Sequence, residues 1–100
     1  MKIDKAFPIK YLSASDITKD TSLEIKDVTM EEIGFARDKK LVVQFHGLDK
    51  GLVLNKTNAN KISAVLESDD TDDWKDKKIT LTIKEVEYQG ESVSAIRVAD

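Results

Sequence analysis

The stretch 40-KLVVQFHGLDKGLVLNKTNANKISAVLE-67 contains two strand patterns, a turn and a helix pattern in one continuous run. Its first part places Leu41, Val43 and Phe45 on one face and the alternate residues on the other, which is the two-residue period of a strand. Gly47 and Gly51 supply a tight turn, and residues 52–54 are apolar again. The stretch therefore predicts a hairpin of residues 40–46 and 52–54, followed directly by a helix.

The predicted helix rests on a change of period after residue 54. Apolar residues then recur at intervals of three and four, as one narrow stripe: Ala59, Ile62, Val65 and Leu66. Asn55, Thr57 and Asn58 are all competent N-caps, because their side-chain oxygens can accept from free N–H groups of the first turn. We expect Asn55 or Thr57 to be the cap. The helix should last about three turns and end near Ser68, where Asp residues disfavour a helix interior.

Further strand patterns lie on both sides of this stretch. Residues 21–31 alternate in two phases, which predicts a strand with a β-bulge: first Leu23 and Ile25, then Val28 and Met30. A fourth strand is predicted from Ile79, Leu81 and Ile83, and its phase also shifts, at Val86 and Tyr88, so we expect a second bulge there. Gln89–Gly90 forms a turn, and residues 93–98 are the fifth strand.

The resulting order of elements is β-β-β-α-β-β. Long strands with bulges allow a small sheet to curve until it closes, and a helix between strands three and four is typical of the OB-fold. We therefore expect an all-β fold with one α-helix, a small five-stranded OB-like barrel formed by one domain of residues 1–100. Residues 1–20 are irregular, and five apolar side chains there are expected to cover one barrel opening: Phe7, Ile9, Tyr11, Leu12 and Ile17.

Three segments resemble motifs of small phage and prophage proteins of unassigned function. They are KGLVLNKTNA at residues 50–59, DDTDDW at residues 69–74 and AIRV at residues 95–98. The resemblance covers residues 11–98, and it implies a bacteriophage origin and an OB-like barrel rather than an activity. One departure is Asp76, which stands where that pattern often has glycine.

The composition limits the class of protein. Of 100 residues, 40% are hydrophobic and 35% charged, which is typical of a globular domain. There is no cysteine, so disulfides and thiolate metal sites are excluded. No stretch reaches the roughly 18 apolar residues of a membrane span, and the N-terminus lacks the apolar core of a signal peptide. We expect a cytoplasmic protein that does not associate with membranes, and the phage resemblance implies that this is the cytoplasm of a bacterial host cell.

Charge is distributed unevenly along the chain, although the net charge is only -3. Residues 35–61 carry six basic and two acidic side chains, a net charge of +4. Residues 62–76 carry six acidic and one basic side chain, a net charge of -5. The basic block includes the predicted second and third strands, whereas the acidic block is expected to be a solvated loop.

The sequence contains no recognisable catalytic or metal-binding motif. His46 is the only histidine, so a zinc site would need carboxylates as its other ligands, and we expect His46 to be a surface residue at a strand end. The acidic run at residues 69–73 is not a calcium site, because a calcium loop that began at Asp69 would have Trp74 at the position that needs glycine. Phosphate-binding glycine motifs and a catalytic carboxylate pair are also missing. The sequence predicts a non-enzyme without a metal or other cofactor.

Two residues and one pair are expected to have structural roles. Trp74 follows the helix and is predicted to fill the core, with its N–H bonded to a carbonyl oxygen. Asn55 and Asn58 are more simply explained as helix caps than as ligand contacts. Arg97, near the end of the fifth strand, is expected to be exposed or loosely paired rather than bound to a phosphate.

Two hypotheses for function remain open. The first is weak, sequence-independent binding of single-stranded DNA, in which basic residues contact phosphates and two polar residues contact bases: Arg37, Lys39, Lys40, Lys50 and Lys56, with Gln44 and His46. Aromatic residues are only 6% of the chain, which argues against base stacking. The second is a protein-interaction module that docks on a phage or host protein, or a structural subunit of a virion. The sequence leaves the oligomeric state open.

Overall fold

The computed structural model describes residues 11–33 and 36–100, which form one antiparallel five-stranded sheet with one α-helix. In chain order, the elements are η1 (Ala14–Asp16), β1 (Thr21–Ile33), β2 (Asp38–Phe45), β3 (Leu52–Val53), α2 (Lys56–Leu66), η2 (Thr71–Trp74), β4 (Lys78–Tyr88) and β5 (Glu91–Val98). The predicted class, mostly β with an α-helix between the third and fourth strands, is confirmed. The two short 3-10 helices, η1 and η2, were not predicted.

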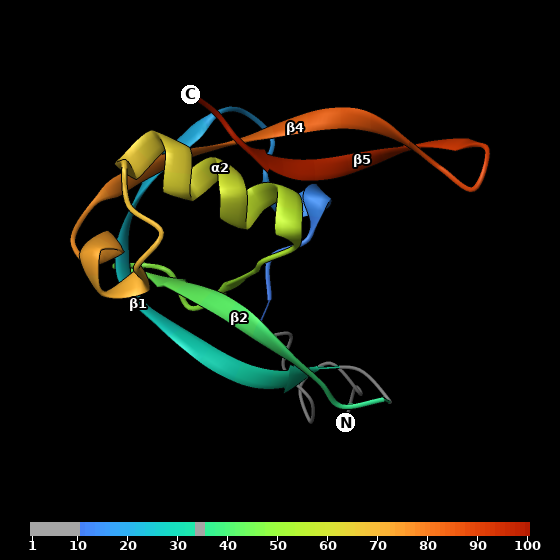
Figure 1. Ribbon diagram of the computed structural model, residues 1–100. Coiled ribbons are helices and arrows are strands. Elements are labelled where there is room, and N and C mark those ends of the chain that lie inside the picture. Colours follow the sequence, from blue (N-terminus) through green and yellow to red (C-terminus); the bar gives the residue numbers. More distant parts are fainter. Residues whose placement is uncertain (1–10, 34–35) are drawn as a thin grey trace, which may run out of the picture.

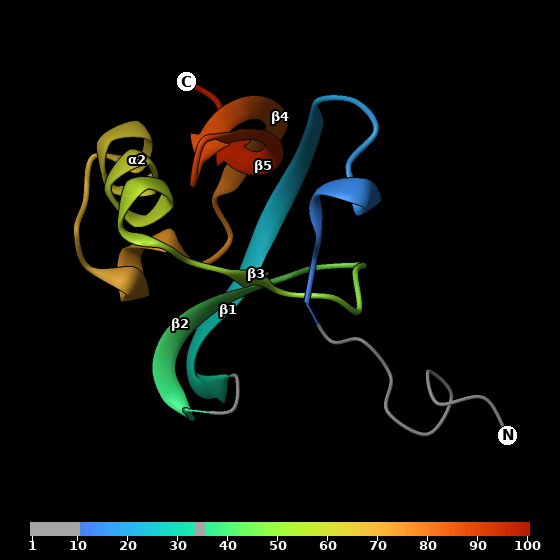
Figure 2. The ribbon, with the colours of Figure 1, turned by 90° about the vertical axis from the view of Figure 1, so that its right-hand side faces the viewer.

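Strand β1 is shared between two partners. The order across the sheet is β3-β2-β1-β4-β5, and residues 21–24 of β1 pair with β4 whereas residues 25–33 pair with β2. The register shifts between Ile25 and Asp27, so the bulge predicted in this strand lies at the change of partner. Figure 2 shows β1 running as one bent strand from the β4 side of the molecule to the β2 side.

Closure of the sheet differs from the predicted barrel. β3 and β5 are the two edges of the sheet, and no strand pairing joins them in the described part of the chain. A groove of about 220 Å³ separates them, and Leu12, Ser13 and Ala14 form its third wall. β3 has only two residues before the chain turns into the helix, so it offers too little backbone to pair with β5 as well as β2.

The N-terminal segment, residues 11–17, is held beside this gap. The backbone N–H of Leu12 donates to the carbonyl oxygen of Gly51 at 2.8 Å, and Tyr11 forms a parallel bridge to Gly51. η1 contacts β5, and Ile17 is buried in the core. Of the other side chains expected to cover a barrel opening, Leu12 packs against the core, and Phe7 and Ile9 lie outside the described residues.

The residues at the two ends of helix α2 determine where the helix begins and ends. Oδ1 of Asn55 accepts from the backbone N–H of Asn58 at 2.7 Å, so Asn55, and not Thr57, is the N-cap. Glu67 ends the helix in the left-handed conformation, with φ of 58°. In Figure 1 the helix lies between β2 and β5, and Ile62 faces the core with no exposed surface. No helix in the described residues combines the length and apolar character needed to cross a membrane.

Both the strands and the helix contribute to the main cluster of the core. Trp74 is 2% exposed, and its indole N–H donates to the carbonyl oxygen of Ser68 at 2.8 Å, which confirms its predicted position in the core. The other buried members of the cluster are Ile17, Ile25, Val43, Phe45, Leu52, Leu54, Ile62, Ile79, Leu81, Ile96 and Val98.

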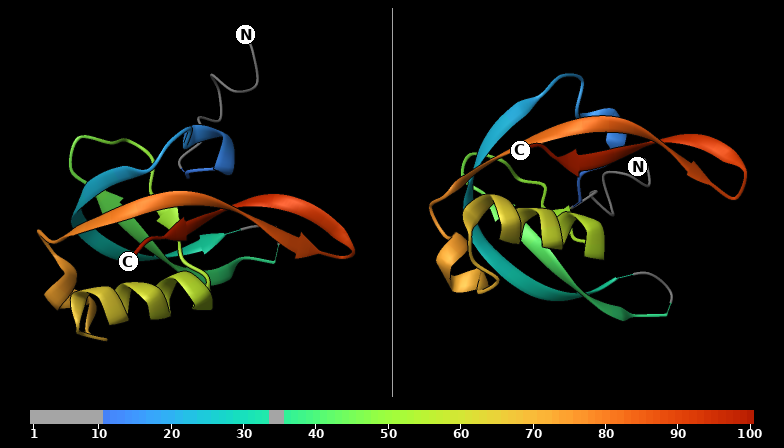
Figure 3. Two further views of the ribbon diagram at one scale, coloured as in Figure 1. Left: turned by 90° about the horizontal axis from the view of Figure 1, so that it is seen from above. Right: turned by 45° about the horizontal axis from the view of Figure 1, so that its top comes forward.

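The second predicted bulge, in β4, is wrong. The β4–β5 register is unbroken from Leu81↔Val98 to Tyr88↔Glu91. The apolar phase changes because β1 pairs with β4 only as far as Leu81. Beyond this residue the β4–β5 hairpin projects from the sheet (Figure 3). Val86 and Val93 pair on the opposite face of this projection, so they need no shift in register. Gln89 and Gly90 both have positive φ, as a two-residue hairpin turn of type I′ requires.

Candidate nucleic-acid interface

Three of the seven predicted site residues line one groove at the start of helix α2, and a fourth, Arg37, precedes the strand that forms part of its wall. Lys56 is the first residue of the helix, Lys39 and Lys40 follow Asp38 at the start of β2, and Arg37 lies in the turn before β2. All four side chains are exposed. Lys39, Lys40 and Lys56 line a groove of about 340 Å³ whose remaining walls are Leu41, Leu54, Asn55 and Ala59. We call this the β2 groove. Its three ammonium groups can bind phosphates, and the N-terminus of the helix adds a favourable dipole.

The other three predicted residues are not part of this groove. Gln44 Nε2 donates to Glu31 Oε2 at 3.2 Å, and Lys50 Nζ donates to Asp16 Oδ1 at 3.0 Å. His46, at the end of β2, lies 3.1 Å from Asp76 and 3.7 Å from Glu24. Each of the three therefore already contacts a carboxylate that the sequence pattern did not place beside it.

The outer face of β1 and β2 is less suited to DNA than predicted because an acidic side chain lies at its centre. The Glu31 carboxylate accepts from Tyr11, Thr29 and Gln44, and the first of these bonds is 2.7 Å long. The bond to Glu31 raises the pKa of the Tyr11 hydroxyl, and burial and the negative charge of Glu31 raise it further. A carboxylate at this position repels the phosphates of DNA, so Gln44 is poorly placed for the expected contacts with bases.

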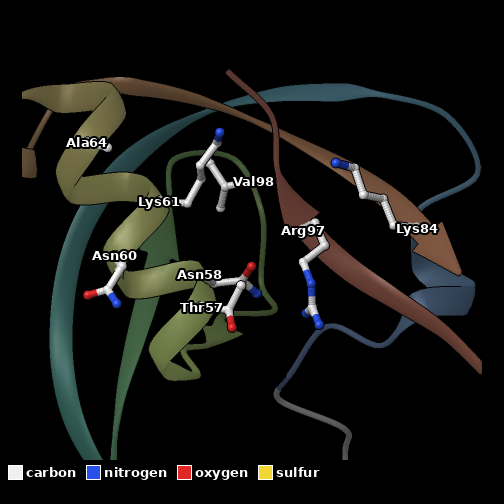
Figure 4. Close-up of a pocket in the computed structure, with 8 residues that line it drawn as sticks. All are labelled: Thr57, Asn58, Asn60, Lys61, Ala64, Lys84, Arg97 and Val98. Atoms are coloured by element: carbon white, nitrogen blue, oxygen red, sulfur yellow. The ribbon is translucent and has the colours of Figure 1, made fainter. Parts of the chain in front are cut away.

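A second basic groove lies on the other flank of α2. It has a volume of about 590 Å³, and its cations come from three elements: Lys61 from α2, Lys84 from β4 and Arg97 from β5 (Figure 4). We call this the β5 groove. Thr57, Asn58, Asn60, Ala64 and Val98 complete the lining. The two grooves share the first turns of the helix, so basic side chains flank this end of α2 on both sides.

The charge of the β5 groove is only partly neutralised. The Lys61 ammonium donates to the Asp100 carboxylate, and this bond lowers the pKa of Asp100, with a further contribution from nearby Lys84. Arg97 is half-buried and donates to the carbonyl oxygen of Ile96 at 3.1 Å, and it forms no ion pair within residues 11–33 and 36–100. The guanidinium is thus available for an anion. This agrees with the expectation that Arg97 is exposed or only loosely paired.

Asn58 anchors the helix to the wall of this groove instead of capping it. The side chain is 3% exposed, and its Nδ2 donates to the carbonyl oxygen of Ile96 at 3.0 Å. Its Oδ1 has no hydrogen-bond partner among the described residues. The prediction of Asn58 as a capping residue is therefore wrong, because only Asn55 supplies a side-chain oxygen to the first turn.

Lys84 was missed, although the sequence contained a signal for it. The Gln89–Gly90 turn fixes the pair Tyr88↔Glu91, and the unbroken register then places Lys84 opposite Ala95 and Thr82 opposite Arg97. Lys84 and Arg97 are therefore diagonal neighbours on one face of the hairpin. The pairing of β5 with the helix flank, in contrast, depends on Asn58 and is not visible in any local pattern.

The acidic block lies at the opposite end of the helix from the basic surface. Asp70 caps η2 by accepting from the backbone N–H of Asp72 at 3.0 Å, and Ser68 donates to Asp73 at 2.7 Å. These carboxylates follow the C-terminus of α2, and their negative charge disfavours an anion at this end of the helix.

No family model, curated protein or solved structure matches this chain.

Proposed function

We propose that this chain is a non-catalytic OB-like domain of phage type that binds single-stranded DNA weakly and without sequence preference, in the cytoplasm of a bacterial host. The binding surface is the α2 basic surface, formed by Arg37, Lys39, Lys40, Lys56, Lys61, Lys84 and Arg97. The observation that carries the proposal is the pair of basic grooves on the two flanks of the first helical turns.

The order of the strands supports the OB-like part of the proposal. A five-stranded OB barrel has the order β3-β2-β1-β4-β5, with the helix between β3 and β4, and it is often only partly closed. This chain has the same order with a gap between β3 and β5. The basic surface crosses the flanks of the helix, whereas oligonucleotide-binding OB domains use the face of strands 2 and 3. The proposed site therefore lies along the helix and the start of β2 rather than over the whole face of strands 2 and 3.

The expected mode of binding is electrostatic. The aromatic side chains in the described residues are away from both grooves or buried, so stacking contributes little and backbone phosphates supply most of the affinity. About three to five phosphates can contact the surface, which predicts a slope of log affinity against log salt of about -2 to -3.5. Binding should accordingly be modest at physiological salt.

The test is fluorescence anisotropy with a labelled oligothymidine at several salt concentrations. Lys39→Glu combined with Lys40→Glu should lower affinity at least tenfold, because two phosphate contacts become repulsive. Lys75→Glu combined with Lys77→Glu is the matched control, since it changes the net charge equally at exposed positions outside both grooves. Equal losses in the two variants would refute a defined surface, and no binding by the natural chain at low salt would refute the function.

Docking on a phage or host protein is a second candidate, favoured by the projecting end of the β4–β5 hairpin. Tyr88 is 65% exposed and Val93 is 37% exposed there, and β5 is an edge strand. Cross-linking in host extract, compared by mass spectrometry, tests this function. A partner lost on Tyr88→Ser with Val93→Ser, and retained in the variant with glutamate at residues 39 and 40, would favour protein binding over DNA binding.

A further inference from the structure

Three side chains that could bind a metal converge from distant parts of the chain. Glu24 lies on β1, His46 follows β2, and Asp76 lies between η2 and β4. One ligand atom from each lies within 4.8 Å of the other two. The separations of 22 and 30 residues match no sequence motif, which is why the sequence predicted no metal. The two carboxylates that a site on His46 would need are nevertheless beside it.

We propose that Glu24, His46 and Asp76 bind one Zn²⁺ ion. His46 Nε2 lies 3.1 Å from Asp76 Oδ1 and 3.7 Å from Glu24 Oε1. Ligands at about 2.0–2.2 Å around a tetrahedral Zn²⁺ are about 3.4 Å apart, so small side-chain movements can bring these three atoms into place. The imidazole favours zinc over magnesium or calcium, which prefer oxygen ligands alone. The fourth position would face solvent, because all three side chains are partly exposed.

The backbone holds the three residues in register with one another. The N–H of His46 donates to the carbonyl oxygen of Glu24 at 3.0 Å, and the N–H of Asp76 donates to that of Ile25 at 2.8 Å. Both segments are thus attached to adjacent residues of β1. Because these hydrogen bonds already fix the backbone of all three residues, little conformational entropy would be lost when a metal binds.

Asp76 has a backbone conformation that most side chains avoid. Its φ is 65°, in the left-handed region where glycine is favoured and Asp is among the better tolerated alternatives. Its carboxylate and that of Glu24 are both directed to the His46 ring, so two negative charges lie close together. A divalent cation would neutralise this repulsion and leave the site without net charge. The alternative without an ion is that the His46 ring N–H donates a hydrogen bond to the Asp76 carboxylate.

The site lies where β1 changes partner, so a bound ion would act on the whole sheet. Glu24↔Lys78 is the last pair between β1 and β4, and Ile25↔Phe45 is the first between β1 and β2. Zinc would therefore link β1, the end of β2 and the segment before β4 next to the bulge. Because an ion that binds only the folded state stabilises it, zinc should raise the melting temperature.

The test uses the purified full chain, treated with EDTA, dialysed and titrated with ZnCl₂ by calorimetry and thermal melting. We expect one ion per chain, a higher melting temperature with Zn²⁺ than with EDTA, and no rise with Mg²⁺. The Hε1 proton signal of the single histidine should shift on binding. Absence of one-to-one binding, or binding without a shift of the His46 signal, would overturn the proposal and favour the alternative, a hydrogen bond from His46 to Asp76 without an ion.

Two variants keep the test decisive if His46→Ala folds poorly. Asp76→Gly removes a ligand while placing glycine at a left-handed position, so it should fold at least as well without metal and lose at least tenfold in zinc affinity. Asp72→Asn with Asp73→Asn is the control for adventitious binding to the acidic block, and it should leave the zinc affinity unchanged. A loss in this control with none in Asp76→Gly would assign the ion to the acidic block and overturn the proposal.

Discussion

The curled sheet is covered in two places by segments of different character. Near the bend of β1, η2 contacts the strand and inserts Trp74, which is 2% exposed and belongs to the apolar core. At the gap between β3 and β5, the N-terminal segment contributes one buried side chain, Ile17, and several polar contacts. The η2 segment is held mainly by apolar burial, which salt and pH change little. The N-terminal segment combines the burial of Ile17 with hydrogen bonds and an ion pair, which are more sensitive to salt and pH.

The polar contacts of the N-terminal segment are distributed over three partners. Leu12 N–H donates to Gly51, Tyr11 donates to Glu31, and Asp16 accepts from Lys50. Such contacts contribute less per residue than a buried indole, because water competes for every donor and acceptor. The comparison therefore predicts unequal stability: loss of η2 packing should unfold the domain, whereas loss of the segment should loosen one edge.

The largest effect is expected from Trp74→Ala. Removal of a buried indole typically costs about 3–5 kcal/mol, which approaches the whole stability of a small domain. Urea unfolding followed by far-ultraviolet circular dichroism measures this cost without relying on tryptophan fluorescence. Tyr88→Ala is the control, since Tyr88 is 65% exposed and its loss should cost less than about 1 kcal/mol. Similar costs in the two variants would show that Trp74 in the core stabilises the domain no more than Tyr88 at the end of the β4–β5 hairpin.

An intermediate effect is expected from Gly51→Ala, at the junction of the N-terminal segment with β3. A methyl group there would come within 2.6 Å of Val42 Cγ1, and Val42 is fully buried. Overpacking of this kind costs about 1–3 kcal/mol. Equilibrium unfolding of Gly51→Ala, Val42→Ala and the double variant forms a cycle, and the double variant should be more stable than additivity predicts. Strict additivity would show that the two sites do not touch.

The smallest effect is expected from Asp16→Asn, and it should depend on pH. Bonds from Ser13 and Lys50 lower the pKa of Asp16 from its ordinary value of 3.8. A lowered pKa stabilises the folded state above pH 3.8, and this contribution is lost as the pH falls through the lower folded-state pKa. Asp16→Asn should therefore reduce the melting temperature slightly at neutral pH and not in strong acid. A reduction that is unchanged by acid would assign the effect to the geometry of η1 rather than to charge.

Local patterns predicted the elements well and their partners poorly. Asn55, the strands and the bulge in β1 follow from residues within a few positions of each other, so their energetics are visible in the sequence. The partners of Gln44 and Lys50 are carboxylates 13 and 34 residues away, and only the register and the placement of η1 bring them close. The bulge wrongly predicted in β4 also reflects missing information about partners. The alternation of apolar residues shows which side chains are buried, and where the β4–β5 hairpin extends beyond the sheet the buried face changes without any change in strand pairing.

The division of β1 between two partners also affects how the chain can fold. Pairing of β1 with β2 joins residues no more than about twenty positions apart, whereas pairing with β4 joins Thr21 to Leu81 and must close a loop of about sixty residues. Local pairings form at a smaller entropic cost, so the hairpin of β1 and β2 can precede the rest of the sheet. The pairing of residues 21–24 of β1 with β4 therefore carries the larger loop-closure cost, and we expect the C-terminal hairpin to pair with β1 after β2 does.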